Sequence, residues 1–174
     1  MPKIHKALSD WDAPYMQPLV QLAEKQSKTT LARWAIDYAE QVMLPLWNKH
    51  DPDDRRPQAA LNAAREWLSG TVKLPQAKKL ILLCHAAARE AEVNPVAQAA
   101  ARAIGQSAST IHSARHCMGL VFYGALAIAY DRLGTNASWD DLEQCAADEC
   151  GRMLDALRVI AVENEPEPAK IRRL

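Results

Sequence analysis

The feature that most constrains the fold of this chain is an apolar stretch without charge that follows its middle. Between Cys117 and Tyr130 the sequence carries no charged residue. This run is shorter than the roughly 20 apolar residues that a membrane-spanning helix needs, and Gly119 and Gly124 interrupt it. We therefore interpret it as a helix surrounded by other helices of the same protein, and we predict no membrane segment.

The composition extends the helical interpretation to the rest of the chain. Alanine is abundant, and runs of β-branched residues with a period of two are missing. A chain of 174 residues is of ordinary size for one domain. We predict an all-α, single-domain bundle of about six or seven helices around a central apolar helix at about 109–132.

Prolines, glycines and capping residues mark the expected helix ends. The expected helices lie near 19–23, over 28–46, 57–69 and 75–92, over 94–133 with a break near 106–109, and from Ser138 onward. Pro45 should kink the second of these helices or end it early. We predict a helical domain over 14–162, a loose N-terminal arm at 1–13, and a disordered tail, rich in proline and charge, at 163–174.

Charge and cysteine usage exclude several classes of protein. The chain has 21 basic and 21 acidic residues, so its formal net charge is zero. General nucleic-acid binders carry a basic excess, and we therefore predict no nucleic-acid partner. The first residues, MPKIHKALSDWDAP, resemble no signal peptide, and the four cysteines form no CxxC pair. We expect a reduced, cytoplasmic protein.

Two histidines near the apolar run suggest a metal site or a structural pair. His112 and His116 are four residues apart, so on a continuous helix they would share one face, as zinc ligands do. The third candidate ligand is His85. No glutamate follows the first histidine, and Arg115 is an adjacent cation that disfavours a metal. We favour a structural pair that hydrogen-bonds between packed helices, and we predict no cofactor.

Several other polar residues fall on or beside alanine-rich helical faces. With the histidines they form a predicted polar core seam: Arg65, His85, Arg89, Arg102, Thr110, His112, His116 and Tyr123. The arginines either form interhelical salt bridges with acids such as Asp53, Asp54, Glu66 or Glu90, or line a site for an acidic partner or phosphate. The sequence contains no glycine-rich phosphate loop, nucleophile elbow or paired-carboxylate motif, so we predict no enzyme.

The tryptophans divide into two groups. Trp34 and Trp67 fall on apolar stripes and are expected in the core. Trp11, Trp47 and Trp139 lie in loops or at helix ends, where we expect more exposure. Exposed tryptophans of this kind either cover the end of a bundle or contribute to a protein interface.

The sequence contains two alanine-rich segments, RRPQAALNAAREWLSG and LCHAAAREAEVNPVAQAAARAIGQSASTIHSARHCMGLVFYGALA. Over about 53–130 they give the chain a resemblance to the helical putative immunity protein family of bacterial polymorphic toxin systems. The residues that carry it are Arg56, Pro57, Arg65, Trp67, Gly70, His85, Arg89, Gly105, Gln106, Thr110, His112, His116 and Gly119. Arg115 and Cys117 depart from the small or apolar residues that the family pattern has around its second histidine.

The resemblance implies a small cytoplasmic bacterial protein that binds and neutralises a cognate toxin without catalysis. Such a protein acts through exposed charged and aromatic residues, and we predict that the loop 50–56 contributes them. The partner-binding candidates are Trp47, Asp53, Asp54 and Arg56. Two alternatives stay open: a helical metal- or small-molecule-binding protein that uses His85, His112 and His116, and a structural domain without a ligand that forms a homo-oligomer.

Overall fold

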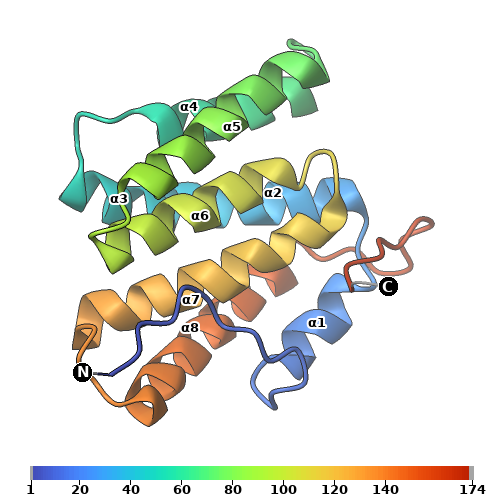
Figure 1. Cartoon of the computed structure of the whole chain (residues 1–174). Coiled ribbons are helices and arrows are strands. Elements are labelled where there is room, and N and C mark those ends of the chain that lie inside the picture. The colour runs from blue at the N-terminus through green and yellow to red at the C-terminus, as the bar shows by residue number, and fades with distance from the viewer. Residues whose placement is uncertain (1, 173–174) are drawn as a thin grey trace.

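Residues 2–172, the part of the chain that the computed structural model describes, form eight α-helices and no β-strand (Figure 1). The helices are α1 (Gln17–Ala23), α2 (Lys28–Tyr38), α3 (Leu44–His50), α4 (Arg56–Leu68), α5 (Leu74–Glu90), α6 (Pro95–Ser109), α7 (Cys117–Leu133) and α8 (Trp139–Ile160). A π-helical segment, η1 (Ala39–Met43), joins α2 to α3, and a 3-10 turn, η2 (Ala114–His116), precedes α7. The prediction of an all-α, single-domain bundle is confirmed.

The helix expected over 28–46 is divided by the segment before Pro45. Proline has no amide hydrogen, and its ring clashes with the carbonyl group four residues earlier, here that of Gln41. The wider turn of η1 accommodates this clash, and α3 then begins at Leu44 with Pro45 in its first turn. One expected helix therefore becomes two, which explains why residues 2–172 contain eight α-helices instead of six or seven.

The expected break in the long stretch 94–133 is also present. Three hydroxyl groups at the end of α6 donate to backbone carbonyls four residues earlier: Ser107 to Ala103 at 2.7 Å, Ser109 to Gly105 at 2.8 Å and Thr110 to Gln106 at 3.2 Å. Such bonds compete with the helical ladder and favour its end. The break lies over 110–116, later than the predicted 106–109, so the apolar helix begins at Cys117 instead of near 109.

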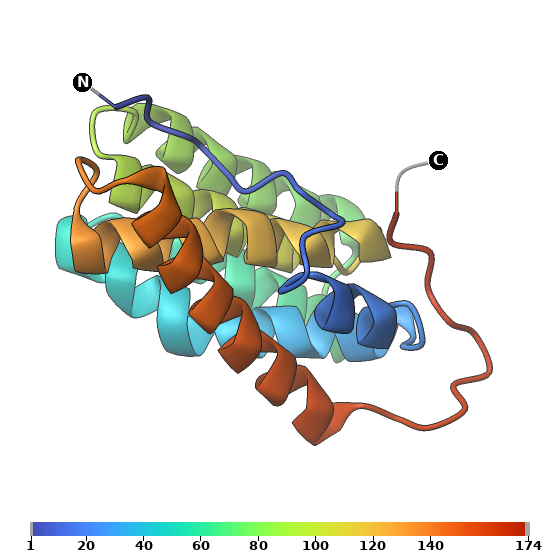
Figure 2. The same cartoon turned by 90° about the horizontal axis from the view of Figure 1, so that it is seen from below.

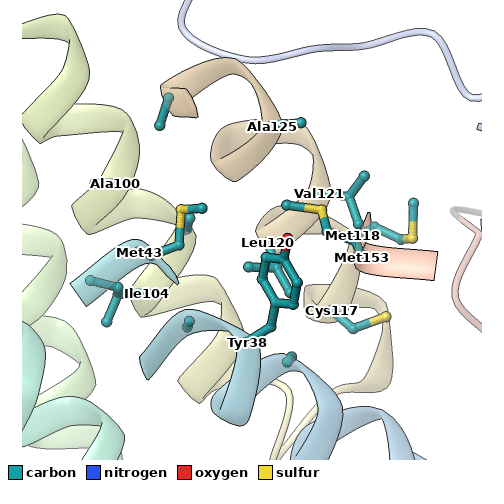
Figure 3. Close-up of a cluster of buried hydrophobic side chains, with 14 of the residues drawn as sticks. Tyr38, Met43, Ala100, Ile104, Cys117, Met118, Leu120, Val121, Ala125 and Met153 are labelled. Carbon is teal, nitrogen blue, oxygen red and sulfur yellow. The ribbon is translucent and has the colours of Figure 1, made fainter. Parts of the chain in front are cut away.

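The core lies where α6 and α7 pack along each other. Figure 3 shows Ala100 and Ile104 of α6 facing Leu120 of α7, with Met43 and Met153 on either side. The remaining faces of α6 pack against α3, α4 and α5, whereas α8 covers α7. The uncharged run is thus surrounded by protein, and in the described part of the chain no helix has the length and apolar character that spanning a bilayer requires.

The N-terminal segment crosses α7 as an extended strap (Figures 1 and 2). The backbone of His5 exchanges two hydrogen bonds with the Tyr130 hydroxyl, which accepts from the amide at 2.9 Å and donates to the carbonyl at 2.8 Å. Leu8 is buried, and its amide donates to the Phe122 carbonyl at 3.0 Å. The expectation of a loose arm understated these contacts, because Leu8 and Trp11 carry apolar surface that α7 buries.

The C-terminal segment returns to α1 without forming a helix. The Ala169 amide donates to the Gln26 carbonyl at 2.8 Å, Ile171 is buried, and Arg172 pairs with Glu24 at 2.7 Å. The prediction of a disordered tail therefore missed an apolar anchor at Ile171. Residue 1 of the predicted arm and residues 173–174 of the predicted tail lie outside the described residues.

Candidate functional site

Three helices bring polar side chains together beside the core. His85 comes from α5, and Arg102 and Gln106 come from α6. His116 ends η2 just before α7, and Tyr123 comes from the middle of α7. We call these five residues the α5–α7 seam. All five side chains are half-buried, so each is desolvated on one side and accessible on the other.

Two glycines allow the seam to form. A Cβ atom at Gly105 would lie 2.6 Å from Cε1 of His85, and one at Gly119 would lie 2.4 Å from Cβ of Gln106. Because real Cβ atoms do not approach other atoms so closely, the His85 ring occupies the space above Gly105, and Gln106 occupies the space above Gly119. The glycines thus let polar side chains of α5 and α6 reach the backbone of the next helix.

Hydrogen bonds fix the protonation pattern of the two seam histidines. Arg102 donates from Nη1 to Nδ1 of His85 at 3.2 Å, so this nitrogen carries no proton. The carbonyl oxygen Oε1 of Gln106 lies 2.8 Å from Nδ1 of His116, which must therefore donate. These two hydrogen bonds link α6 to α5 and to the turn that begins α7.

The surroundings keep both imidazoles neutral. Burial lowers the pKa of His85, and the positive charges of Arg102 and Arg89 lower it further. Burial likewise lowers the pKa of His116 to about 4, with smaller contributions from His112 and Arg115. At neutral pH the fixed positive charge of the seam therefore belongs to Arg102.

His112 lies beside the seam but not on the helix that we predicted. It belongs to the turn after α6, whereas His116 ends η2, so the expected i, i+4 pair on one continuous helix is wrong. The chain reverses between them, because α6 ends at Ser109. Their ring centroids are nevertheless 5.2 Å apart, and burial lowers the pKa of His112.

The metal hypothesis finds no support in this arrangement. Within residues 2–172, no three side chains of the His, Cys, Asp or Glu type are grouped so that they could hold a metal ion. His85 is held by Arg102 and His116 by Gln106, so each of these rings already uses one nitrogen for a protein contact. The candidates His85, His112 and His116 are better explained as parts of interhelical packing.

The seam opens into two pockets beneath the N-terminal strap, with Tyr123 lining both. The first pocket has a volume of 370 Å³ and is lined by Ile4, His5, Lys6, Glu92, Gln98 and Arg102 among others. The second has a volume of 360 Å³ and is lined by Leu8, Trp11, Gln106, Arg115, His116 and Gly119 among others. Strap residues line both pockets, so the strap covers the accessible side of the seam.

Three residues predicted for the seam lie elsewhere or act differently. Arg65 faces α2 and η1, where it pairs with Asp37 at 2.8 Å and with Glu40 at 2.5 Å, because this side of α4 packs towards α2. Arg89 is exposed on α5. Thr110 is buried, and its hydroxyl serves the helix end instead of a site.

The loop 50–56 is held in place by its own residues and by contacts with α3 and α5. Trp47 is only 1% exposed, and its indole N–H donates to the Asp54 carbonyl at 2.9 Å. The Arg56 guanidinium pairs with Asp54 at 2.6 Å and also with Glu90 of α5, and it lowers the pKa of the Asp54 carboxyl. Asp53 is exposed.

The burial and pairing of these residues determine which of them remain candidates for binding a partner. The expectation that Trp47 is exposed is wrong, because its ring lies inside the bundle and anchors the loop from below. Asp54 and Arg56 are half-buried and paired, whereas Asp53 is exposed and forms no ion pair within residues 2–172. Trp34 is buried as predicted, whereas Trp67, which was also expected in the core, is only partly buried at its edge. Trp11 and Trp139 are partly buried as well.

One buried polar pair was missed by sequence reasoning. The Tyr38 hydroxyl donates to the carboxylate of Glu149, which is 2% exposed, and burial together with this bond raises the pKa of Tyr38. A signal was present, since Glu149 falls between Ala146 and Met153 on the apolar stripe of α8. A carboxylate at such a position needs a buried donor.

Comparison with known families gives one finding. A family model described as Imm-5 like putative immunity protein matches residues 21–156, which include α2 to α7 and most of α8. Comparisons with curated proteins and with solved structures give no match.

Proposed function

The chain belongs to the Imm-5 like putative immunity protein family, and from this premise we propose that it binds and neutralises a cognate bacterial toxin in the cytoplasm without catalysing a reaction. The observation that carries the proposal is the extent of the match, since 21–156 contains nearly the whole bundle, including the α5–α7 seam. An immunity protein of this kind covers the surface that its toxin needs for activity. Its recognition residues must therefore be exposed and held in a defined position.

We place the toxin-binding surface at the loop between α3 and α4. Asp51 and Asp53 are exposed there, and Glu90 of α5 adds a carboxylate that is 64% exposed. The pairing of Arg56 with Asp54 and Glu90 holds the loop against α5, so little conformational entropy is lost on binding. The chemistry fits a basic patch on the toxin, whose positive charge would attract this surface before contact.

The experiment measures binding to the toxin encoded beside the gene for this protein. Reversing Asp51 and Asp53 to lysine should weaken the affinity at least about tenfold, mainly through a slower association rate. The difference in affinity between the variant and the unmodified protein should shrink as salt is added, because exposed charges are screened. Asp53→Lys is preferred to Asp54→Lys, which would also break the ion pair with Arg56.

A matched control reverses two exposed carboxylates on the far element α8, Asp148 and Asp155. This variant carries the same change in net charge and should retain the affinity. If both double variants bind equally well, the loop is not the recognition surface. If the unmodified protein neither binds nor inhibits the toxin, the immunity function itself is wrong.

A further inference from the structure

We propose that the pocket beside Arg102 binds a small anion that carries a carboxylate or phosphate group. This pocket has a volume of 370 Å³ and lies between α6, α7 and the N-terminal strap. The proposal concerns a ligand of the isolated protein, so it stands independently of toxin binding.

The central observation is that Arg102 has a guanidinium group without an acidic partner. Its side chain is half-buried at the wall of the pocket. Among residues 2–172 no carboxylate lies within 4.0 Å of its nitrogens, whereas Arg56 and Arg65 each pair with two. Its one hydrogen bond in this part of the chain runs from Nη1 to the neutral His85 ring. A desolvated guanidinium with unused donors is suited to bidentate contact with a planar carboxylate or a phosphate.

The rest of the pocket supplies groups that complement an anion. Lys6 of the strap adds a second positive charge, and Gln98 and Tyr123 add neutral polar groups. The Gln98 amide is already oriented, because its Nε2 donates to the Ala88 carbonyl at 2.9 Å. Glu92 lines the same pocket and opposes a negative ligand. With two cations against one carboxylate, the fixed charge still favours a small anion.

The strap makes the pocket a site with a defined outer wall. Ile4, His5 and Lys6 line it, and the two hydrogen bonds between the His5 backbone and the Tyr130 hydroxyl hold them over α7. His5 also stacks on Trp139 with a ring-centroid distance of 4.2 Å. Because Lys6 follows this anchored residue directly, a ligand held by Arg102 and Lys6 would join the strap to α6.

The test uses two probes, succinate for the carboxylate class and inorganic phosphate for the phosphate class. Each is titrated into the isolated protein at constant ionic strength, with sodium chloride as the reference, while NMR follows the Arg102 Nε–H signal and the amides of residues 5 and 6. We expect saturable shifts with a Kd of about 1 mM or lower for at least one probe. Saturation by succinate alone assigns a carboxylate ligand, and saturation by phosphate alone assigns a phosphate ligand.

Two variants and a control make the result specific. Arg102→Gln should weaken binding at least about tenfold, and Arg158→Gln, an exposed arginine on α8, should leave it unchanged. Lys6 is exposed on the strap, so Lys6→Gln leaves the packing of the bundle intact. We expect it to weaken binding of the same probe by about threefold or more. This variant therefore tests the site even if Arg102→Gln fails to fold. Shifts that stay linear with concentration for both probes, or saturation that is equally strong in Lys6→Gln and in a folded Arg102→Gln, would overturn the proposal.

Discussion

The α5–α7 seam and the loop 50–56 are both built from polar and charged residues, yet packing treats them in opposite ways. In the seam, His85 and Gln106 fill the space above Gly105 and Gly119, so their positions depend on a missing side chain in the neighbouring helix. In the loop, the ion pairs of Arg56 hold the backbone in place, and the other acidic side chains stay exposed. Steric fit fixes one region, and electrostatic pairing fixes the other.

This difference between the seam and the loop indicates which kind of residue carries the family resemblance. Most residues that carry the resemblance and lie in α5 to α7 are parts of the seam or touch it, including His85, Gly105, Gln106, His116 and Gly119. In this chain their contacts hold three helices together. Recognition of one particular partner needs exposed residues, which are free to differ. Asp53, which is exposed in the loop, is not one of the residues that carry the family resemblance.

The largest expected effect concerns the anchor beneath the loop. Trp47→Ala removes a fully buried ring together with the hydrogen bond to the Asp54 carbonyl. We expect the free energy of unfolding to fall by about 3–5 kcal/mol, as measured by urea denaturation. Trp47→Phe keeps most of the apolar volume and should lose clearly less, while toxin affinity stays unchanged. A normal stability for Trp47→Ala, or lost affinity in a stable Trp47→Phe, would return Trp47 to the recognition surface.

The next effect tests the steric interlock of the seam. In Gly119→Ala the new methyl group would meet Cβ of Gln106 at 2.4 Å, an atom that cannot move without the backbone of α6. We expect a loss of about 1–3 kcal/mol in the free energy of unfolding, despite the better helix propensity of alanine. Thermal or urea unfolding measures this loss.

Gly151→Ala is the matched control for this substitution. Gly151 lies within α8, and a Cβ atom there would meet nothing within 4 Å. The same chemical change should therefore stabilise the protein by about 0.5–1 kcal/mol. If Gly119→Ala is as well tolerated as Gly151→Ala, the glycine does not hold the seam open.

The sequence predicted the helices well because their signals are local. Apolar periodicity and caps such as Asn94 and Ser138 lie within a few residues of the boundaries that they set. The π-helical segment before Pro45 was foreseen only as a kink or an early helix end, since the sequence shows the clash but not which way the backbone relieves it.

Contacts between distant residues were harder to predict. The pairing of Arg65 with Asp37 and Glu40 depends on how α4 is rotated against α2, and nothing in either helix alone determines that rotation. The burial of Trp47 and the anchoring of the strap at Tyr130 are of the same kind. For the seam, the residue types were identified but their partners were not, because Gly105 and Gly119 act only across helices.

The last expected effect separates the seam from the loop by its dependence on pH. Burial lowers the pKa of His116 from 6.5 to about 4 in the folded protein, so the unfolded chain takes up a proton first as the pH falls. Proton uptake by the unfolded chain favours unfolding, and the contribution of His116 to stability is therefore lost progressively between these two pH values. His116→Asn keeps an N–H group that can donate to Gln106 but does not titrate.

Urea denaturation from about pH 7 to about pH 4 measures the free energy of unfolding of the variant and of the unmodified protein. Near pH 5 the variant should take up about one proton less on unfolding, so its free energy of unfolding should fall less steeply as the pH is lowered. Carboxylates titrate in both proteins over the lower part of this range, so their contribution cancels in the comparison. Asp53→Lys serves as the companion variant from the loop, since it changes an exposed charge and leaves His116 in place. Its curve should retain the steep dependence of the unmodified protein near pH 5. Parallel curves for His116→Asn and the unmodified protein would mean that burial does not lower the pKa of His116 in the folded protein, and the contrast between a half-buried seam and an exposed loop would then fail.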